Sequence, residues 1–370
     1  MAFSRDGTRL ASAHRDGTVL VRAVASNEVR YGEFQAGLSS MSALAFDRAG
    51  KRLALASEDS SIQFWDLARG RLHPEVLNAT QGVFLGTRSD ESLALTSIAY
   101  SPDGTMIASG SEDKKVRLWN VASGKLDAVL PVHQGNVSAV AFSPDGSLLA
   151  SAGDKSVVVS EVAPPHKVLW QQAQHDNEAM ALAFNRDGSR LASAARNGAV
   201  FVWDARSGQQ QWTQRLDKTE IFALAYSPDG RSLAAGAAGA IHFWNAEDGS
   251  ATKPIQVQGN VSSIAFDRAG QRLASGASDG MVRLWDVSLR KPIGQPFEGH
   301  DKLVNSVAFS ADGKTVASVG ADRRIWLWDA DQPGWSKRAC AIVPLGAKPD
   351  VWPWPRSLPA QSKRRSVCAP

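Results

Sequence analysis

A unit of about forty residues recurs along most of this chain, and this repetition restricts the possible folds more than any other feature. Each unit contains a short turn that ends in glycine. These glycines lie 40 to 54 residues apart, at Gly7, Gly50, Gly104, Gly146, Gly188, Gly230, Gly270 and Gly313. Fourteen or fifteen residues later stands a second marker, which is Trp65, Trp119, Trp203, Trp244, Trp285 or Trp328 in six units and Arg22 or Ser160 in the other two. Two markers that keep this spacing through eight units are typical of the blades of a β-propeller.

Each unit reads as a series of short strands separated by turns. In one unit an apolar strand from Val137 to Phe142 runs into Ser143-Pro144-Asp145-Gly146, which has the composition of a type I turn. A second strand from Leu148 to Ala152 returns antiparallel to the first. We therefore predict an all-β propeller of eight three- to four-stranded units. The alternative is a seven-bladed ring with a partial N-terminal unit.

The last unit carries further motifs, and through them the chain resembles the WD40-repeat family. It contains Gly299-His300, the stretch Ser318 to Asp322 and "WLWD" at Trp326 to Asp329. In that family a histidine, a serine, an aspartate and a tryptophan form a hydrogen-bonded chain that locks a blade. The resemblance assigns these four positions, which we call the tetrad, to His300, Ser318, Asp322 and Trp328.

Three other units keep the tryptophan together with part of the tetrad. The resemblance assigns the partial tetrads to Ser109, Asp113 and Trp119, to His175, Ser193, Asn197 and Trp203, and to Ser275, Asp279 and Trp285. A buried polar chain stabilises a fold only when every member has a partner. We therefore expect the last blade to be the best locked, and the units around Arg22, Ser160 and Gly239 to be the softest.

The repeats divide the chain into a propeller over residues 1–330 and a proline-rich, basic tail over residues 331–370. The tail is expected to cap the ring or to be disordered, with binding of an acidic partner or RNA as the alternative. The first unit is truncated, since Met1 lies inside its first strand. Either the reading frame begins inside a longer repeat protein, or Lys337 to Val343 supplies the missing outer strand of the last blade. Extra residues within 71–97 form either a binding loop or a longer fourth strand with a surface loop.

Charge and cysteine content restrict the class of protein. The net charge is +4, but the tail alone holds seven basic and two acidic residues, so the propeller region is close to neutral. This balance argues against a nucleic-acid groove. Both cysteines lie in the tail, and no apolar run is long enough to cross a membrane. We predict a cytoplasmic protein without membrane contact.

The sequence offers no catalytic constellation, and we predict a chain that is not an enzyme and has no cofactor or metal. Gly276 to Gly280 matches the G-x-S-x-G nucleophile motif. That motif requires a turn from a strand into a helix, whereas this stretch lies at a turn between two strands. The seven histidines are scattered, and three of them occupy equivalent positions of the repeat, which favours a structural role.

Surface loops therefore remain as the expected functional part. In WD40 proteins, the turns between second and third strands and the links from fourth to first strands meet on one rim of the ring. The candidate rim residues are Arg15, Lys114, Lys155, Asp176, Arg196, Glu220, Asp301, Arg323 and Arg324. They would suit a charged peptide or a loop of a partner protein, or they are ordinary solvated turns.

We predict a non-catalytic protein-interaction scaffold, monomeric as an isolated ring. Its alanine- and glycine-rich repeats are similar to the C-terminal propellers of bacterial WD40 signalling proteins. This similarity implies a role in a bacterial signalling or regulatory protein. The alternatives are a ligand-sensing propeller, a nucleic-acid-binding propeller or a propeller enzyme.

Overall fold

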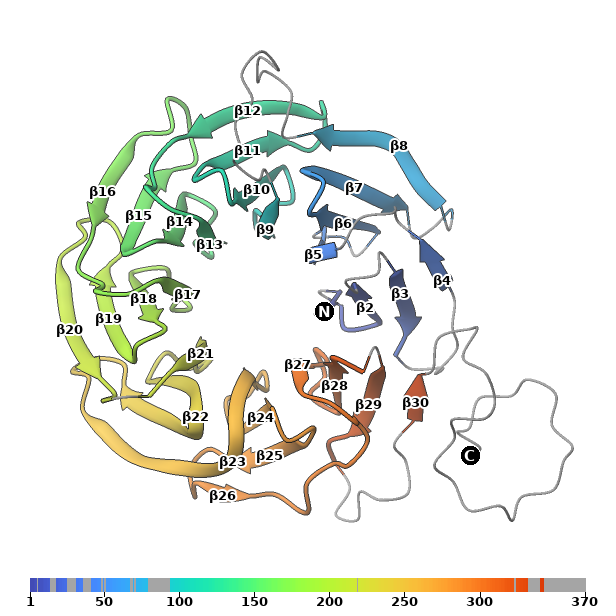
Figure 1. The fold of residues 1–370 in the computed structure, drawn as a ribbon, viewed down its shortest axis with the longest axis vertical. Helices are drawn as coiled ribbons and strands as arrows, with labels where there is room; N and C mark the ends of the chain where they lie inside the picture. The colour runs from blue at the N-terminus through green and yellow to red at the C-terminus, as the bar shows by residue number, and fades with distance from the viewer. Residues whose placement is uncertain are drawn as a thin grey trace, which may run out of the picture.

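The strands of this protein form a ring of sheets around a central opening in a computed structural model (Figure 1). The structure describes residues 1–4, 6–13, 18–24, 31–35, 41–47, 49, 51–66, 69, 71–78, 94–217, 219–322, 324–331 and 340–342. Every regular element within these ranges is a β-strand. Neighbouring strands of each sheet run antiparallel, as the turn-rich repeat predicts.

The strands of the first half of the chain are short, from two to eight residues. They are β1 (Ala2–Phe3), β2 (Arg9–Ala13), β3 (Thr18–Ala23), β4 (Tyr31–Gln35), β5 (Met41–Phe46), β6 (Arg52–Ser57), β7 (Ser61–Asp66), β8 (Arg71–Asn78), β9 (Leu95–Tyr100), β10 (Met106–Ser111), β11 (Val116–Asn120), β12 (Lys125–Leu130), β13 (Val137–Phe142), β14 (Leu148–Gly153), β15 (Ser156–Glu161) and β16 (Val168–Gln172).

The second half contains two unusually long strands. Its elements are β17 (Ala179–Phe184), β18 (Arg190–Ala195), β19 (Ala199–Asp204), β20 (Gln210–Arg215), β21 (Ile221–Tyr226), β22 (Ser232–Asn245), β23 (Ala251–Phe266), β24 (Arg272–Ala277), β25 (Val282–Asp286), β26 (Lys291–Pro292), β27 (Val304–Phe309), β28 (Thr315–Gly320), β29 (Ile325–Asp329) and β30 (Cys340–Ile342).

The sheets follow the sequence repeat, but their number differs from the prediction. Within the described ranges there are six four-stranded blades, β1–β4, β5–β8, β9–β12, β13–β16, β17–β20 and β27–β30, and one six-stranded sheet, β21–β26. Neither eight separate units nor seven blades with a partial first unit describes this arrangement. Two units are joined because β22 and β23 run without interruption, and β23 pairs with β22 along its first half and with β24 along its second.

The recurring turn is held by its own side chains. Gly146 N donates to Ser143 O at 2.8 Å, and Gly146 has a φ of +75°, which glycine adopts without strain. Leu148 N donates to Ser143 Oγ at 2.9 Å, while Asp145 Oδ1 accepts a hydrogen bond from Ser147 N at 3.0 Å. The serine and aspartate of the motif therefore fix the reversal from the first strand of a blade to the second.

The core lies between neighbouring sheets, on both faces of each blade. Between β5–β8 and β9–β12, the small residues Ala54 and Ala56 allow close approach, and Ile62, Leu95 and Trp119 fill the space. All five are at most 1% exposed. Complete burial of an aliphatic side chain such as Ile62 contributes about 1.5–3 kcal/mol. This packing explains why the strands lack a clean alternation of polar and apolar residues.

The ring closes where its first and last sheets meet. Leu10 of β2 packs in one apolar cluster with Ala317, Val319 and Leu327 of the last sheet. Within the described ranges no strand is shared between these sheets, since β1–β4 and β27–β30 are separate. Strand β30 pairs with β29 and supplies the outer strand of the last blade, which is the role considered for Lys337 to Val343. Residues 79–93 of the insertion and the rest of the tail lie outside the described ranges.

Candidate functional site

The four tetrad side chains of the last blade form one continuous hydrogen-bonded chain. His300 Nδ1 lies 2.9 Å from Asp322 Oδ1, and His300 Nε2 lies 2.8 Å from Ser318 Oγ. Trp328 Nε1 donates to the same Ser318 Oγ at 2.9 Å. Burial alone would raise the pKa of Asp322, but hydrogen bonds, above all that from His300, hold it below its usual value. The link that precedes β27 is thereby tied to the second and third strands of its blade.

Two blades without the histidine use an arginine in its place. Trp119 Nε1 donates to Ser109 Oγ at 3.0 Å, as in the last blade. Arg117 and Asp113 form an ion pair with 2% and 1% of their side chains exposed. In the second of these blades, Arg283 Nη2 lies 2.6 Å from Asp279 Oδ2. Sequence reasoning missed these arginines, although an arginine four residues after the turn aspartate is visible in both units.

The second of these blades keeps the same bond between strands. Trp285 Nε1 donates to Ser275 Oγ at 2.8 Å, within the six-stranded sheet. The serine therefore fixes the tryptophan of the third strand in both blades, whether or not a histidine completes the chain.

The tetrad of β17–β20 is interrupted at its turn. His175 Nε2 lies 2.9 Å from Ser193 Oγ, and Trp203 Nε1 donates to that oxygen at 3.0 Å. Asn197, which replaces the aspartate, donates instead to Asp176 Oδ1. His175 Nδ1 is buried without a hydrogen-bond partner among the described residues. Burial lowers the pKa of His175 to about 4, so this imidazole is neutral near pH 7.

Strand β15 has Ser160 at the position that the tryptophan occupies elsewhere. His133 Nε2 lies 2.8 Å from Ser151 Oγ, and His133 Nδ1 lies 3.0 Å from Ser156 Oγ. Ser156 Oγ also donates to Asp154 Oδ1 at 2.7 Å. Ser156, at the start of the third strand, thus takes part in the polar chain of this blade.

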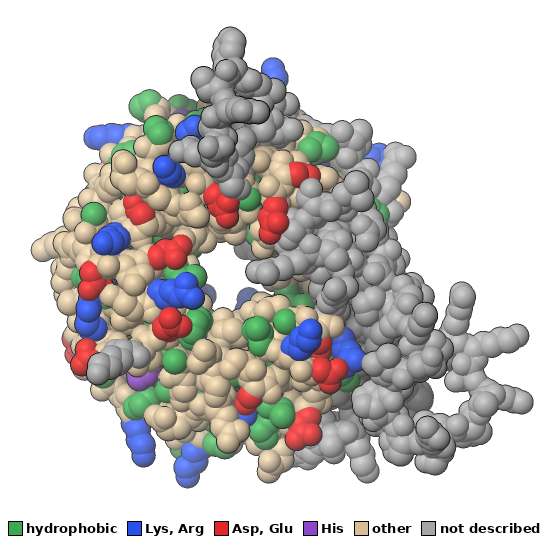
Figure 2. All heavy atoms as spheres, in the orientation of Figure 1, with side chains coloured by type: hydrophobic (Ala, Val, Ile, Leu, Met, Phe, Trp, Pro, Cys, Tyr) green, Lys and Arg blue, Asp and Glu red, His purple; other side chains and the backbone are tan. Residues whose placement is uncertain are grey.

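The described candidate rim residues all lie at the same end of the strands. They occupy turns between second and third strands or links into the next first strand, and they are Lys114, Lys155, Asp176, Arg196, Glu220, Asp301 and Arg324. The remaining candidates, Arg15 and Arg323, lie outside the described residues. On the face of the ring shown in Figure 2, acidic and basic side chains are interspersed around the central opening.

Ion pairs join several of these residues across neighbouring connections. Arg324 Nη1 contacts Asp301 Oδ2 at 2.6 Å, and Arg196 Nε lies 3.6 Å from Glu220 Oε1. Asp176 pairs with Arg215, and hydrogen bonds from Arg215 and then Asn197 lower the pKa of this carboxyl to about 2. Basic and acidic members of the candidate rim therefore contact each other. Exposed pairs of this kind add little stability, and here they link one rim connection to its neighbour.

A cleft opens on the rim between the sheets β13–β16 and β17–β20. Its volume is about 390 Å³, and it is lined by Asn136, Asp154, Lys155, Asp176, Asn177 and Glu178. Glu178 Oε1 accepts a hydrogen bond from Ser138 Oγ at 2.8 Å, which holds this carboxylate over the first strand. Amide, carboxylate and ammonium groups are thus offered together at one junction of two blades.

The stretch that matches the nucleophile motif lies in a turn between two strands. Ser278 of the G-x-S-x-G stretch lies in the turn between β24 and β25, and its Oγ accepts a hydrogen bond from Asn260 N at 2.8 Å. Among the residues that the structure describes, no group of three histidine, cysteine, aspartate or glutamate side chains is arranged to hold a metal ion. The same residues include no helix long and apolar enough to span a membrane.

Comparison with known proteins identifies the repeat. The family described as WD domain, G-beta repeat matches residues 31–66, 82–120, 124–159, 252–286 and 290–329, which together make up half of the chain. A second family, described as outer membrane protein assembly factor BamB, matches residues 154–252.

Individual relatives cover only parts of the chain. The WD repeat-containing protein 3 homolog of Dictyostelium discoideum is 34% identical over 101 residues, which are 27% of this chain and 10% of that protein. The Periodic tryptophan protein 2 homolog of the same organism is 46% identical over 48 residues, 13% of this chain and 5% of that protein. The small ribosomal subunit protein RACK1y of Oryza sativa subsp. japonica is 29% identical over 122 residues, 33% of this chain and 34% of that protein.

The relatives and the geometry of the repeat both indicate WD40 repeats. The aligned segments span at most about a third of each of these relatives' own lengths. The organisms are eukaryotes, so the expected similarity to bacterial signalling proteins is not supported. The predicted WD40 repeat itself is confirmed by the family match and by the ring of antiparallel blades. The chain belongs to the WD40-repeat family.

Proposed function

We propose that this protein is a non-catalytic scaffold that binds a protein partner through the rim defined above. WD40 propellers generally act as protein-interaction scaffolds. The observation that carries the proposal is the way in which the rim connections are held. Tetrad bonds and ion pairs fix them to the blades, as His300 and Asp301 are fixed by Asp322 and Arg324. Binding to connections that are already ordered costs little conformational entropy.

The partner is a charged peptide or a loop of a protein rather than a nucleic acid. The guanidinium groups of Arg196 and Arg324 are paired with carboxylates of the same rim. Nucleic-acid binding requires cations that are free to replace counterions along a phosphate backbone. The cleft beside Asp176 offers hydrogen-bond donors and acceptors of both charges, which suits the mixed polar surface of a protein segment.

We infer that the ring contains eight structural units, two of which are fused. Eight apolar clusters separate successive sets of strands in the described residues. One of them lies inside the six-stranded sheet, where Ile241 and Phe243 of β22 pack with Leu273 of β24 and Trp285 of β25. The two halves of this sheet therefore pack against each other as neighbouring blades do. That the ring is monomeric and that the protein is cytoplasmic remain predictions.

Affinity capture with charge-reversal variants tests the proposed function. The full chain is used as bait beside Arg196→Glu and Arg324→Glu, which place a carboxylate next to Glu220 and Asp301. Lys125→Glu, on the exposed outer strand β12, is the matched control. Proteins captured by the wild type should fall by about tenfold with the rim variants and remain with the control, because like charges then meet at the interface. An identical set of captured proteins for all four baits would contradict the proposal.

A further inference from the structure

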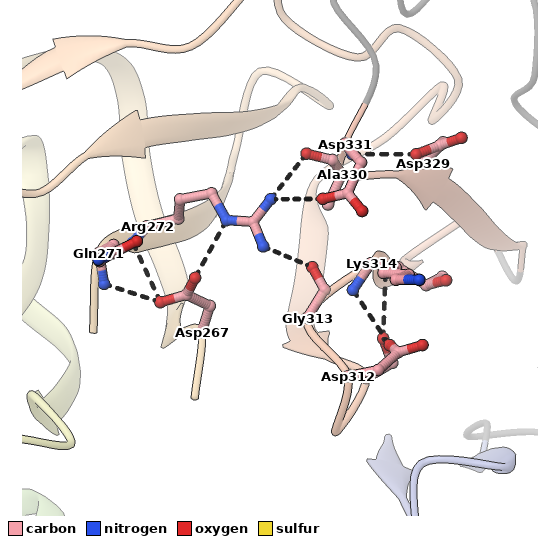
Figure 3. Close-up of polar contacts among 11 residues, drawn as sticks. Asp267, Gln271, Arg272, Asp312, Gly313, Lys314, Asp329, Ala330 and Asp331 are labelled. Atoms are coloured by element: carbon pink, nitrogen blue, oxygen red, sulfur yellow. Dashed lines mark hydrogen bonds and ion pairs between the residues drawn. The ribbon is translucent and has the colours of Figure 1, made fainter. Parts of the chain in front are cut away.

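An arginine clamp joins the last two sets of strands at the end opposite the rim. Arg272 begins β24 and reaches across to the next blade (Figure 3). Its Nε donates to Asp267 Oδ2 at 3.0 Å, and its Nη2 donates to Gly313 O at 2.8 Å. Its Nη1 donates to Ala330 O at 2.9 Å and to Asp331 Oδ1 at 3.0 Å. Each nitrogen of this guanidinium thus has an acceptor, and two of the acceptors are carboxylates.

The same repeat positions surround a cavity at the junction of β17–β20 with β21–β23. Counted from the turn glycine and the third-strand tryptophan, Arg190 corresponds to Arg272, Asn185 to Asp267, Gly230 to Gly313 and Glu247 to Asp331. The cavity has a volume of about 460 Å³ and is lined by Asn185, Asp187, Ser189, Arg190, Gly230, Arg231, Asn245 and Glu247. The cavity therefore lies where the contacts of the Arg272 clamp lie at the other junction.

One change of side chain explains the difference. Asn185 Oδ1 accepts from Arg190 N at 2.9 Å, just as Asp267 Oδ1 accepts from Arg272 N at 3.1 Å. Where Asp267 has its second carboxylate oxygen, however, Asn185 has an NH₂ group, which donates to Ser189 Oγ at 3.1 Å. An amide nitrogen cannot accept a hydrogen bond from a guanidinium. The oxygen that Asp267 supplies to Arg272 Nε has no counterpart on Asn185.

Arg190 is consequently left with unused donors that border the cavity. Among the described residues its only side-chain hydrogen bond runs from Nη1 to Ala246 O at 2.5 Å. No carboxylate of the described residues lies within ion-pair distance of it, although Asp187 and Asp204 interact with its charge. Asp187 is held within its own turn, where Oδ1 accepts from Ser189 N at 2.8 Å and Ser189 Oγ at 2.6 Å. A guanidinium in a cavity wall with free N–H groups is a good donor for a planar oxyanion.

A buried hydroxyl group lies near the same arginine, although its residue does not line the cavity. Tyr226 stands at the repeat position of Phe309, whose ring lies under the Arg272 guanidinium at 5.7 Å. The Tyr226 hydroxyl is buried without a hydrogen-bond partner in the described part of the chain, and it interacts with the charges of Arg190 and Asp187. Burial raises the pKa of Tyr226, so this hydroxyl keeps its proton.

We propose that this cavity binds a carboxylate group, which takes the place beside Arg190 that Asp267 takes beside Arg272. The carboxylate comes either from an acidic side chain of a partner or from a small organic acid. The volume of the cavity suits either source. What this site lacks relative to the closed clamp is the acceptor oxygen that Asp267 gives to Arg272 Nε, and a bound carboxylate supplies that oxygen to Arg190. The site lies at the other end of the strands from the rim and is independent of it.

Ligand-detected NMR titration of the full chain tests the proposal. The probes are succinate and the capped peptide acetyl-Gly-Glu-Gly-amide, each compared with its amide analogue, succinamide or acetyl-Gly-Gln-Gly-amide. We expect at least one carboxylate probe to bind about tenfold more tightly than its amide analogue, because only the carboxylate forms charge-assisted bonds with Arg190. A stronger effect with the peptide identifies a partner segment as the source, and a stronger effect with succinate identifies a small acid.

Three variants separate this site from general effects on the fold. Asn185→Asp should reduce carboxylate binding about tenfold and raise the melting temperature, because the clamp is then closed from within. Arg190→Gln should reduce binding to a similar extent. Arg272→Gln, at the closed clamp, should lower the melting temperature but leave binding within about twofold. Equal binding of carboxylate and amide probes, unchanged binding by Asn185→Asp, or no saturation by any carboxylate would overturn the proposal.

Discussion

Single hydroxyl groups in the second strands connect the polar side chains of this ring. Ser318 Oγ contacts both His300 and Trp328, whereas Ser109 Oγ serves Trp119 in a blade without the histidine. Both serines are at most 1% exposed. The importance of each serine therefore depends on how many buried partners it satisfies, which cannot be seen from its residue type alone.

Replacement of these serines gives a graded prediction. Ser318→Ala leaves two buried nitrogen groups without a partner and should lower the free energy of unfolding by about 2–4 kcal/mol. Ser109→Ala leaves only the Trp119 indole and should cost about 1–2 kcal/mol. Urea denaturation of both variants checks the order. A larger loss for Ser109→Ala than for Ser318→Ala would contradict this role of the tetrad.

The buried His175 makes stability depend on pH. Its pKa is lowered from 6.5 to about 4, so between these values the unfolded chain binds a proton that the folded chain does not. Stability from this group is complete above pH 6.5 and is lost as the pH falls toward 4, by about 3 kcal/mol in total. His175→Gln should flatten this part of the stability profile in denaturation at several pH values. Parallel profiles for the two proteins would show that His175 does not contribute.

At the level of strands, tryptophans on the outer strands join successive blades. Trp170 Nε1 of β16 donates to Ala205 O of the next blade at 2.9 Å, and Trp212 Nε1 of β20 donates to Ala246 O at 3.1 Å. Gly208 lies against the first indole, and a Cβ there would be 2.5 Å from Trp170 Cγ. Outer strands therefore connect blades through side chains, in addition to the packing between sheets.

The two tryptophans form a matched pair for mutation. Both lose similar volume when changed to phenylalanine, but Ala246 O keeps its bond from Arg190 after Trp212→Phe. Trp170→Phe leaves Ala205 O without its indole donor. We expect Trp170→Phe to be the more destabilising of the two by about 1 kcal/mol. Thermal denaturation measures the difference, and equal melting temperatures would argue against the role of these bonds.

Elements within one repeat were predictable, but contacts between repeats were not. The turn motif and the tryptophan spacing predict the strands of each blade, because local turn chemistry and period carry that information. The continuity of β22 through Gly239 was missed because it depends on pairing with β23. Pairing of Arg196 with Glu220 was also missed, since these residues belong to different connections and meet only in the folded ring.

The closure of the ring is the main feature at the scale of the whole molecule. The first and last sheets meet through side chains such as Leu10 and Val319, without a shared strand. Strand β1 pairs with β2 at two positions, whereas β17 pairs with β18 at five. Among the four-stranded blades that the structure describes, the first strand makes the fewest pairings in the first blade.

Hydrogen exchange of the whole chain should reveal this difference. Amides of β2 (Arg9–Ala13) should exchange faster than those of β18 (Arg190–Ala195) and β28 (Thr315–Gly320), because fewer inner-strand bonds must open. Leu10→Ala should widen the difference by weakening the packing at closure. Equal protection of β2 and β18 would show that packing at the closure stabilises the first blade as much as the longer inner strand stabilises the other.

A hydrogen-exchange footprint with a captured partner shows directly whether that protein binds the rim. Protection is compared for the free ring and the complex. We predict slower exchange in the connections at residues 112–115, 154–155, 173–178, 196–198 and 216–220, which lie at the rim end of the strands. Protection confined to the opposite turns, at residues 143–147, 185–189 and 227–231, or to the outer strands would contradict binding at the rim.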